Sequence, residues 1–157
     1  MTTEPKLSVV VPVHNERDNV TSLLLEIEAA LNPLQIEWEA LFVDDLSRDD
    51  TLAVLRGLRR EHPRLRVLHQ SGQSTAVRTG VKAARGAWIA TLDGDGQNDP
   101  ADIPKLLAAR DVGDAQVKLY AGWRVQRKDS GSKRWASKIA NAIRSRLLRD
   151  ETPDTGC

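Results

Sequence analysis

The feature that most constrains the fold is an alternation of short apolar runs with longer helical patterns. Four short runs predict strands at 7–11, 40–43, 66–69 and 88–92, and the valine-rich run at 7–11 is typical of a strand buried on both faces. Amphipathic helical spacing predicts helices between them, at 16–31, 50–61 and 75–84. Asn15 is the expected N-cap of the first helix. Strands that alternate with helices of this length form right-handed βαβ units, so we expect a parallel sheet.

Three clusters of polar residues follow the predicted strands. They lie at 12–16, 44–49 and 93–99, each at the carboxyl end of a strand. The carboxyl ends of parallel strands meet at one edge of a sheet, and open sheets of this kind bind their ligands outside that edge. The three clusters should therefore lie side by side and form one binding site.

The distribution of charge and cysteine narrows the function. The chain has 157 residues, enough for one domain with its own core, and its net charge is only +1, which gives no indication of nucleic-acid binding. Residues 123–149 nevertheless carry nine Lys or Arg against one acid. Such a run is typical of a solvated helix face, and it also suits an anionic partner. Cys157 is the single cysteine, which excludes an internal disulfide and favours a reducing compartment.

The stretch TLDGDGQNDP, residues 91–100, places oxygen-bearing side chains on alternate positions. An EF-hand would need Gly and Glu where this loop has Asn98 and Pro104, so that interpretation fails. A phosphorelay receiver would carry its acidic pair after the first strand, whereas Asp44-Asp45 follows the second. Two carboxylates one residue apart can bind a single divalent cation. The alternative is a solvated turn in which Asp99 caps a helix that starts at Pro100.

Six motifs together resemble the inverting glycosyltransferases of family 2. They are VVVPVHNERDNV, LFVDDLSRDDT, SGQSTAVRTG, TLDGDGQNDP, AGWRVQR and the terminal DTGC, which occur in the order and spacing of that family. The resemblance covers essentially the whole chain and is strongest to the dolichyl-phosphate mannose synthase group. It implies the α/β GT-A fold, a Rossmann-like and mostly parallel sheet with helices on both faces. It also implies that the family segment beginning at DTGC continues beyond the chain, which would then be C-terminally truncated.

The resemblance assigns a nucleoside subsite to the first two clusters. Pro12, His14 and Glu16 match positions that hold the nucleobase and ribose, although the family more often has Tyr where this chain has His14. Val43 and Asp45 match positions that line the nucleoside.

The diphosphate and metal positions follow from the third cluster, again by resemblance. Asp93, Gly94 and Asp95 match the diphosphate-binding segment, and Asp93, Asp95 and Gln97 are the implied ligands of Mg²⁺ or Mn²⁺. Arg124 matches an arginine that contacts the donor phosphate, a role that suits its guanidinium fork.

Asp154 matches an acidic residue near the acceptor, although a terminal acid can also be unstructured. Asp95, Asp154 and Arg124 are the expected catalytic residues. A phosphomonoester acceptor is already largely dianionic at neutral pH, so it needs little deprotonation. The harder task is to stabilise the departing diphosphate, which a metal ion and an arginine would do electrostatically.

These expectations combine into one predicted function. We expect residues 1–157 to form a single metal-dependent hexosyltransferase domain that moves a sugar from a GDP- or UDP-linked donor to a dolichyl- or undecaprenyl-type phosphate with inversion. The alternatives are a family 2 transferase with a saccharide or other hydroxyl acceptor, and a nucleotide-sugar-binding module without turnover. Residues 131–149 form a predicted basic amphipathic helix that either packs on the sheet or binds an anionic membrane surface. The expected location is cytoplasmic and peripheral at the membrane face, without nucleic acid, as a monomer or a homo-oligomer.

Overall fold

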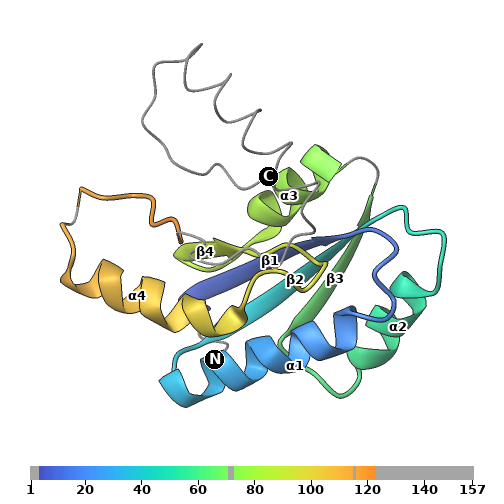
Figure 1. The fold of residues 1–157 in the computed structure, drawn as a ribbon, viewed down its shortest axis with the longest axis horizontal. Coiled ribbons are helices and arrows are strands. Elements are labelled where there is room, and N and C mark those ends of the chain that lie inside the picture. Colours follow the sequence, from blue (N-terminus) through green and yellow to red (C-terminus); the bar gives the residue numbers. More distant parts are fainter. Residues whose placement is uncertain (1–3, 71–72, 115, 123–157) are drawn as a thin grey trace, which may run out of the picture. The chain divides into compact units, whose positions relative to one another are not determined.

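The computed structural model describes residues 4–70, 73–114 and 116–122 (Figure 1). Met1–Val117 form one compact unit, and a second unit begins at Lys118. All the helices and strands of the described residues belong to the first unit. They are β1 (Leu7–Val13), α1 (Val20–Leu31), the short 3₁₀ helix η1 (Asn32–Leu34), β2 (Trp38–Asp45), α2 (Thr51–Leu58), β3 (Leu65–Gln70), α3 (Gln73–Ala83), β4 (Trp88–Thr91), the 3₁₀ helix η2 (Pro100–Asp102) and α4 (Ile103–Val112).

The four strands form one parallel sheet in the order β3-β2-β1-β4. The chain adds β2 and β3 on one side of β1 and then returns to place β4 on the other side. Parallel pairing and the four predicted strands are confirmed, with β1 and β2 longer than the sequence indicates. The reversal of direction falls between β1 and β4, and such a switch point is where open α/β sheets leave room for a ligand.

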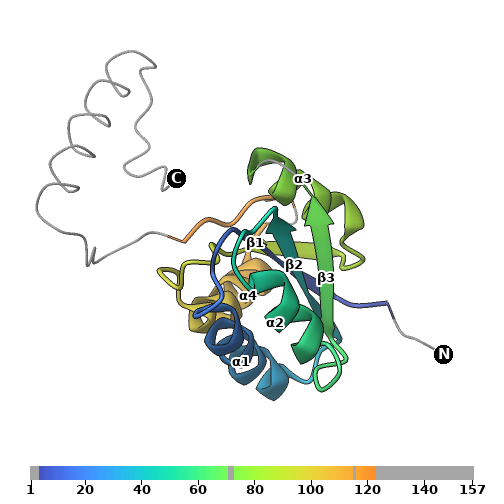
Figure 2. The same ribbon diagram turned by 90° about the vertical axis from the view of Figure 1, so that its right-hand side faces the viewer.

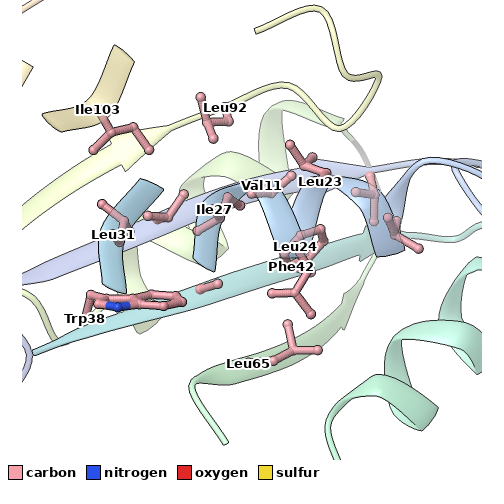
Figure 3. Close-up of a cluster of buried hydrophobic side chains, with 14 of the residues drawn as sticks. Val11, Leu23, Leu24, Ile27, Leu31, Trp38, Phe42, Leu65, Leu92 and Ile103 are labelled. Atoms are coloured by element: carbon pink, nitrogen blue, oxygen red, sulfur yellow. The ribbon is translucent and has the colours of Figure 1, made fainter. Parts of the chain in front are cut away.

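Helices cover both faces of the sheet, as the GT-A resemblance implies. Helices α1, α2 and α4 lie on one face and α3 lies on the other (Figures 1 and 2). The larger core lies under α1, where alternate residues of β1 and β2 meet one stripe of the helix (Figure 3). The side chains at its centre are fully or almost fully buried; they include Val11, Leu23, Leu24, Ile27, Leu31, Trp38 and Phe42. Alternation along each strand therefore divides its residues between two apolar layers.

Helix α3 packs closely on the opposite face because Gly80 has no side chain. A Cβ built on Gly80 would lie 2.3 Å from Cγ1 of Val10 and 3.1 Å from Cγ2 of Val43. Real side chains do not tolerate the shorter distance, so the glycine sets how near the helix axis comes to β1 and β2.

A buried polar cluster ties the end of α3 to the same face. The Glu39 carboxylate accepts hydrogen bonds from the Ser8 hydroxyl at 2.7 Å, from Nη1 of Arg66 at 2.8 Å and from the backbone N–H of Arg85 at 2.8 Å. Nη1 of Arg66 also donates to the carbonyl of Ala83 at 3.0 Å. Burial acts to raise the pKa of Glu39, but the hydrogen bonds from Arg66, Ser8 and Arg85 outweigh it, so this pKa lies below its ordinary value of 4.5.

Acid should therefore destabilise the fold through Glu39. A carboxyl whose pKa is lowered by folding stabilises the protein above its ordinary pKa, and this contribution is lost as the pH falls through the folded value. We expect the free energy of unfolding of the wild type to exceed that of Glu39→Gln at pH 6, and the difference to shrink below about pH 4.5. Urea denaturation at a series of pH values measures it. Glu37→Gln, at an exposed position, is the control, and an equal acid response in all three proteins would contradict the prediction.

The predicted start of the first helix is wrong, and the predicted basic helix is not tested. Helix α1 starts at Val20 rather than at residue 16, and Asn15 is not its N-cap, because the residue adopts a left-handed conformation with φ of 57°. The predicted basic helix at 131–149 lies outside the described residues and stays a prediction. Within the described parts of the chain, no helix is long and apolar enough to cross a membrane.

Candidate nucleotide-sugar site

The loops that follow β1 and β2 are joined by hydrogen bonds at the carboxyl edge of the sheet. The backbone N–H of Asn15 donates to the Ser47 hydroxyl at 2.9 Å, and the backbone N–H of Arg48 donates to Oδ1 of Asn15 at 2.7 Å. The left-handed backbone of Asn15 permits both contacts, and asparagine is among the residues that tolerate this conformation. The two clusters at 12–16 and 44–49 are therefore held together, as the sequence predicts.

His14 contacts the predicted nucleoside residue Asp45. Its Nδ1 lies 2.7 Å from the backbone oxygen of Asp45. A carbonyl oxygen can only accept a hydrogen bond, so Nδ1 carries the proton and donates. In the neutral ring, Nε2 is then an acceptor, and the imidazole is exposed at the carboxyl edge of the sheet. This geometry gives His14 a fixed orientation and one acceptor for a donor group of a ligand.

Glu16 is held by its backbone. Its N–H donates to the Thr51 hydroxyl at 2.9 Å, and its carboxylate accepts from Nδ2 of Asn19 at 2.6 Å. Thr51 is fully buried and its hydroxyl donates in turn to Asp49. That hydrogen bond, together with those from the backbone N–H groups of Thr51 and Arg17, outweighs burial and lowers the pKa of Asp49. Asp49 therefore stays ionised and anchors both loops.

The third cluster reaches the same place through a close approach of Gly94 to β1. A Cβ built on Gly94 would lie 2.7 Å from the carbonyl oxygen of Pro12 and 2.6 Å from Cγ1 of Val13. Gly94 is buried, whereas its neighbours Asp93 and Asp95 are exposed. The chain can pass the end of β1 at this distance only without a side chain. The acidic pair is thereby placed at the switch point between β1 and β4, next to the end of β1 that carries Pro12 and Val13.

The carboxylates of this segment are partly engaged. Oδ2 of Asp93 accepts from Nδ2 of Asn98 at 3.0 Å, and Oδ1 of Asp95 accepts from the backbone N–H of Gln97 at 3.0 Å. Among the described residues each of these contacts uses one oxygen, so the second oxygen of each carboxylate can bind a cation. Asp99 accepts from the backbone N–H of Ala101 at 2.9 Å, which confirms it as the cap of the helix at Pro100.

The residues at 93–97 suit a divalent cation that is bound partly by the protein and partly by the phosphates of a substrate. No group of three or more His, Cys, Asp or Glu that could hold a metal ion occurs in the described residues. Two exposed carboxylates and the amide of Gln97 are oxygen donors of the kind that Mg²⁺ and Mn²⁺ prefer. Mg²⁺ is usually bound by one or two carboxylates together with substrate phosphates rather than by an all-protein cage. The residues at 93–97 fit a site in which one or two carboxylates and the substrate phosphates hold the ion together.

The described structure does not test the roles predicted for three further site residues. Val43 is completely buried, and its side chain packs toward Gly80 on α3, so its place beside the nucleoside stays a prediction. Arg124 and Asp154 lie outside the described residues.

Asp44 is a residue of this edge that sequence reasoning did not assign. Its side chain is fully buried, and Oδ2 accepts from Nδ1 of His69 at 2.7 Å and from the backbone N–H of Ser47 at 3.4 Å. Oδ1 has no hydrogen-bond partner among the residues that the structure describes. Strand alternation could have distinguished it from Asp45, because neighbours on a strand point to opposite faces and Asp44 shares the face of Phe42.

A comparison with protein families decides the relationship. The model of "Glycosyl transferase family 2" matches residues 8–156. The chain belongs to glycosyltransferase family 2. The curated family 2 relatives include a dodecaprenyl-phosphate galacturonate synthase of Rhizobium johnstonii, 38% identical over 97% of this chain and 46% of the relative. Another is an undecaprenyl-phosphate 4-deoxy-4-formamido-L-arabinose transferase of Pseudomonas fluorescens, 36% identical over 96% of this chain and 45% of the relative.

Solved structures support the GT-A-like fold of this family 2 chain. A mannosyltransferase from Pyrobaculum calidifontis, solved with GDP-Man and Mn²⁺, is 27% identical and superimposes with a TM-score of 0.52 over 60% of this chain and 28% of the other. TarS 1–349 of S. aureus, solved with UDP, is 27% identical with a TM-score of 0.56 over 68% of this chain and 32% of the other. The chain spans about half the length of the curated relatives it matches.

Proposed function

We propose that this domain binds a nucleoside-diphosphate sugar at the carboxyl edge of its sheet, and that the protein transfers the sugar with inversion to a polyprenyl phosphate. The observation that carries the proposal is the approach of Gly94 to the end of β1. It brings Asp93 and Asp95 beside the edge where His14 is held by Asp45. The two curated relatives, whose names give polyprenyl-phosphate substrates, support the choice of acceptor.

Separate groups of residues are proposed to bind the nucleoside and the divalent cation. Pro12, His14, Glu16 and Asp45 hold the nucleoside, with Val43 behind them. Asp93, Asp95 and Gln97 would hold Mg²⁺ or Mn²⁺, and the mannosyltransferase solved with GDP-Man and Mn²⁺ supports a divalent ion. Such an ion supplies positive charge that neutralises the diphosphate as it departs.

Arg124 is proposed to contact the donor phosphate and Asp154 to face the acceptor. The acceptor phosphate is already anionic at neutral pH, so the protein has mainly to position it and to stabilise the leaving diphosphate. The basic segment at 131–149 would bind anionic lipid headgroups, which places the protein at the cytoplasmic face of the membrane where a polyprenyl phosphate is available.

Thermal denaturation with UDP or GDP tests the donor half of the proposal. In Mn²⁺, a nucleoside diphosphate at 100 times its dissociation constant should stabilise the domain by about 2.7 kcal/mol, and EDTA should remove most of that gain. A midpoint that neither nucleotide moves in the presence of Mn²⁺ would refute donor binding. Single-turnover transfer to a short polyprenyl phosphate and to a free saccharide, compared in parallel, then identifies the class of acceptor.

A further inference from the structure

Leu46 has a backbone conformation that its side chain does not favour. It follows β2 and Asp45 directly, with φ of 51°, and the residue is 50% exposed. A Cβ is in steric conflict with the neighbouring carbonyl in this left-handed region, and residues other than glycine are uncommon there. Asn15 is also left-handed, but its side chain accepts a hydrogen bond from Arg48. Leucine has no polar atom that could do the same.

The contacts that fix this turn do not use the leucine side chain. The backbone N–H of Ser47 donates to buried Asp44, and the Ser47 hydroxyl accepts from the backbone N–H of Asn15. Both contacts would hold a glycine at position 46 equally well. Leu46 gains only part of the burial available to it, since half of it stays exposed to solvent. Leu46 therefore combines an unfavourable backbone conformation with a half-exposed apolar side chain, and strain of this kind is common where a chain binds a ligand.

The position indicates which ligand it serves. Leu46 follows the residue whose carbonyl holds the His14 ring, and Val13 of β1 pairs in register with Asp44 of β2. We propose that Leu46 is a donor-binding and specificity residue, whose exposed side chain contacts the nucleoside bound beside His14 and Asp45. This inference rests on the proposed function. An apolar side chain suits the flat face of a nucleobase, which is covered on binding and so favours contact with carbon rather than with water.

Two substitutions separate the side chain from the backbone. Leu46→Ala removes most of the side chain and keeps the strained Cβ, whereas Leu46→Gly also removes the strain. Covering the exposed half of a leucine should change affinity by about three- to tenfold. We therefore expect both variants to raise the dissociation constant of UDP or GDP, measured by calorimetry in Mn²⁺, by about that factor. Leu46→Gly should have a melting midpoint at or above that of Leu46→Ala.

Leu25→Ala is a matched control, because Leu25 is the same residue type with the same 50% exposure but lies within α1. Its nucleotide affinity should equal that of the wild type. If the wild type binds nucleotide and Leu46→Ala binds it equally well, the inference is overturned while the proposed function stands. If the wild type binds neither nucleotide in Mn²⁺, both are overturned.

Discussion

Asp95→Asn is expected to weaken Mn²⁺-dependent binding of UDP or GDP by about 100-fold or more, because it removes one of only two anionic groups at the proposed cation site. Nucleotide binding in EDTA should be weak and equal for the wild type and the variant. The fold should be unaffected, since Asp95 is exposed and its contact with the backbone N–H of Gln97 is one that an asparagine oxygen can also make. Calorimetric titration in Mn²⁺ and in EDTA gives the four affinities.

Asp114→Asn is the matched control for this substitution. Oδ1 of Asp114 accepts from the backbone N–H of Gln116 at 2.8 Å, the same contact two residues along the chain that Asp95 makes. Both variants lose one exposed carboxylate in the same kind of turn, so a general effect of charge on nucleotide affinity would appear in both. Equal affinities in the wild type and Asp95→Asn would mean that this aspartate binds no metal.

Gly94→Ala adds a single methyl group and is expected to reduce donor binding and transfer strongly. The new Cβ would lie 2.7 Å from the Pro12 carbonyl oxygen, a backbone atom that cannot rotate away, so the 93–95 segment must move. A displacement approaching 1 Å at a catalytic group can reduce a rate by about 100-fold. We expect a loss of donor binding and transfer of at least tenfold, with a smaller cost in stability from the local strain.

Gly57→Ala gives the comparison for Gly94→Ala. Gly57 lies in α2, and a Cβ there would meet no atom within 4 Å. Alanine in a helix is more favourable than glycine by up to about 1 kcal/mol, so this variant should be slightly more stable and bind nucleotide normally. Nucleotide affinity that is unchanged in Gly94→Ala would show that the acidic pair tolerates displacement from β1.

Much of the fold could be predicted from the sequence because its signals are local. The valine-rich run of β1 and the apolar run of β2 indicate buried strands, and the alternation of strands with helices predicts parallel pairing. The polar clusters then fall at one edge by topology alone. The cap at Asp99 was also predictable, since a capping side chain and the following proline are neighbours in sequence.

The features that the sequence did not predict depend on contacts between distant residues. Asn15 is a residue type that commonly caps helices. Here its side chain accepts a hydrogen bond from Arg48, 33 residues away, its backbone is left-handed, and α1 begins only at Val20. The sequence shows that position 94 is a glycine, but it does not show that this glycine lies against the carbonyl of Pro12. The strain at Leu46 is likewise invisible, because leucine predicts no turn and only the structure reports its φ.

Because the strand order reverses between β1 and β4, the residues proposed to bind the nucleoside and those proposed to bind the cation lie far apart in the sequence. The groups proposed for the nucleoside lie within residues 12–51, on two consecutive strand ends joined by their own hydrogen bonds. The groups proposed for the cation, Asp93, Asp95 and Gln97, arrive only after β4, which follows α3 in the chain. Substitutions within residues 12–51 can therefore change which base is bound, while residues 93–97 keep the cation site. A family built on this sheet can diversify its donors one half at a time.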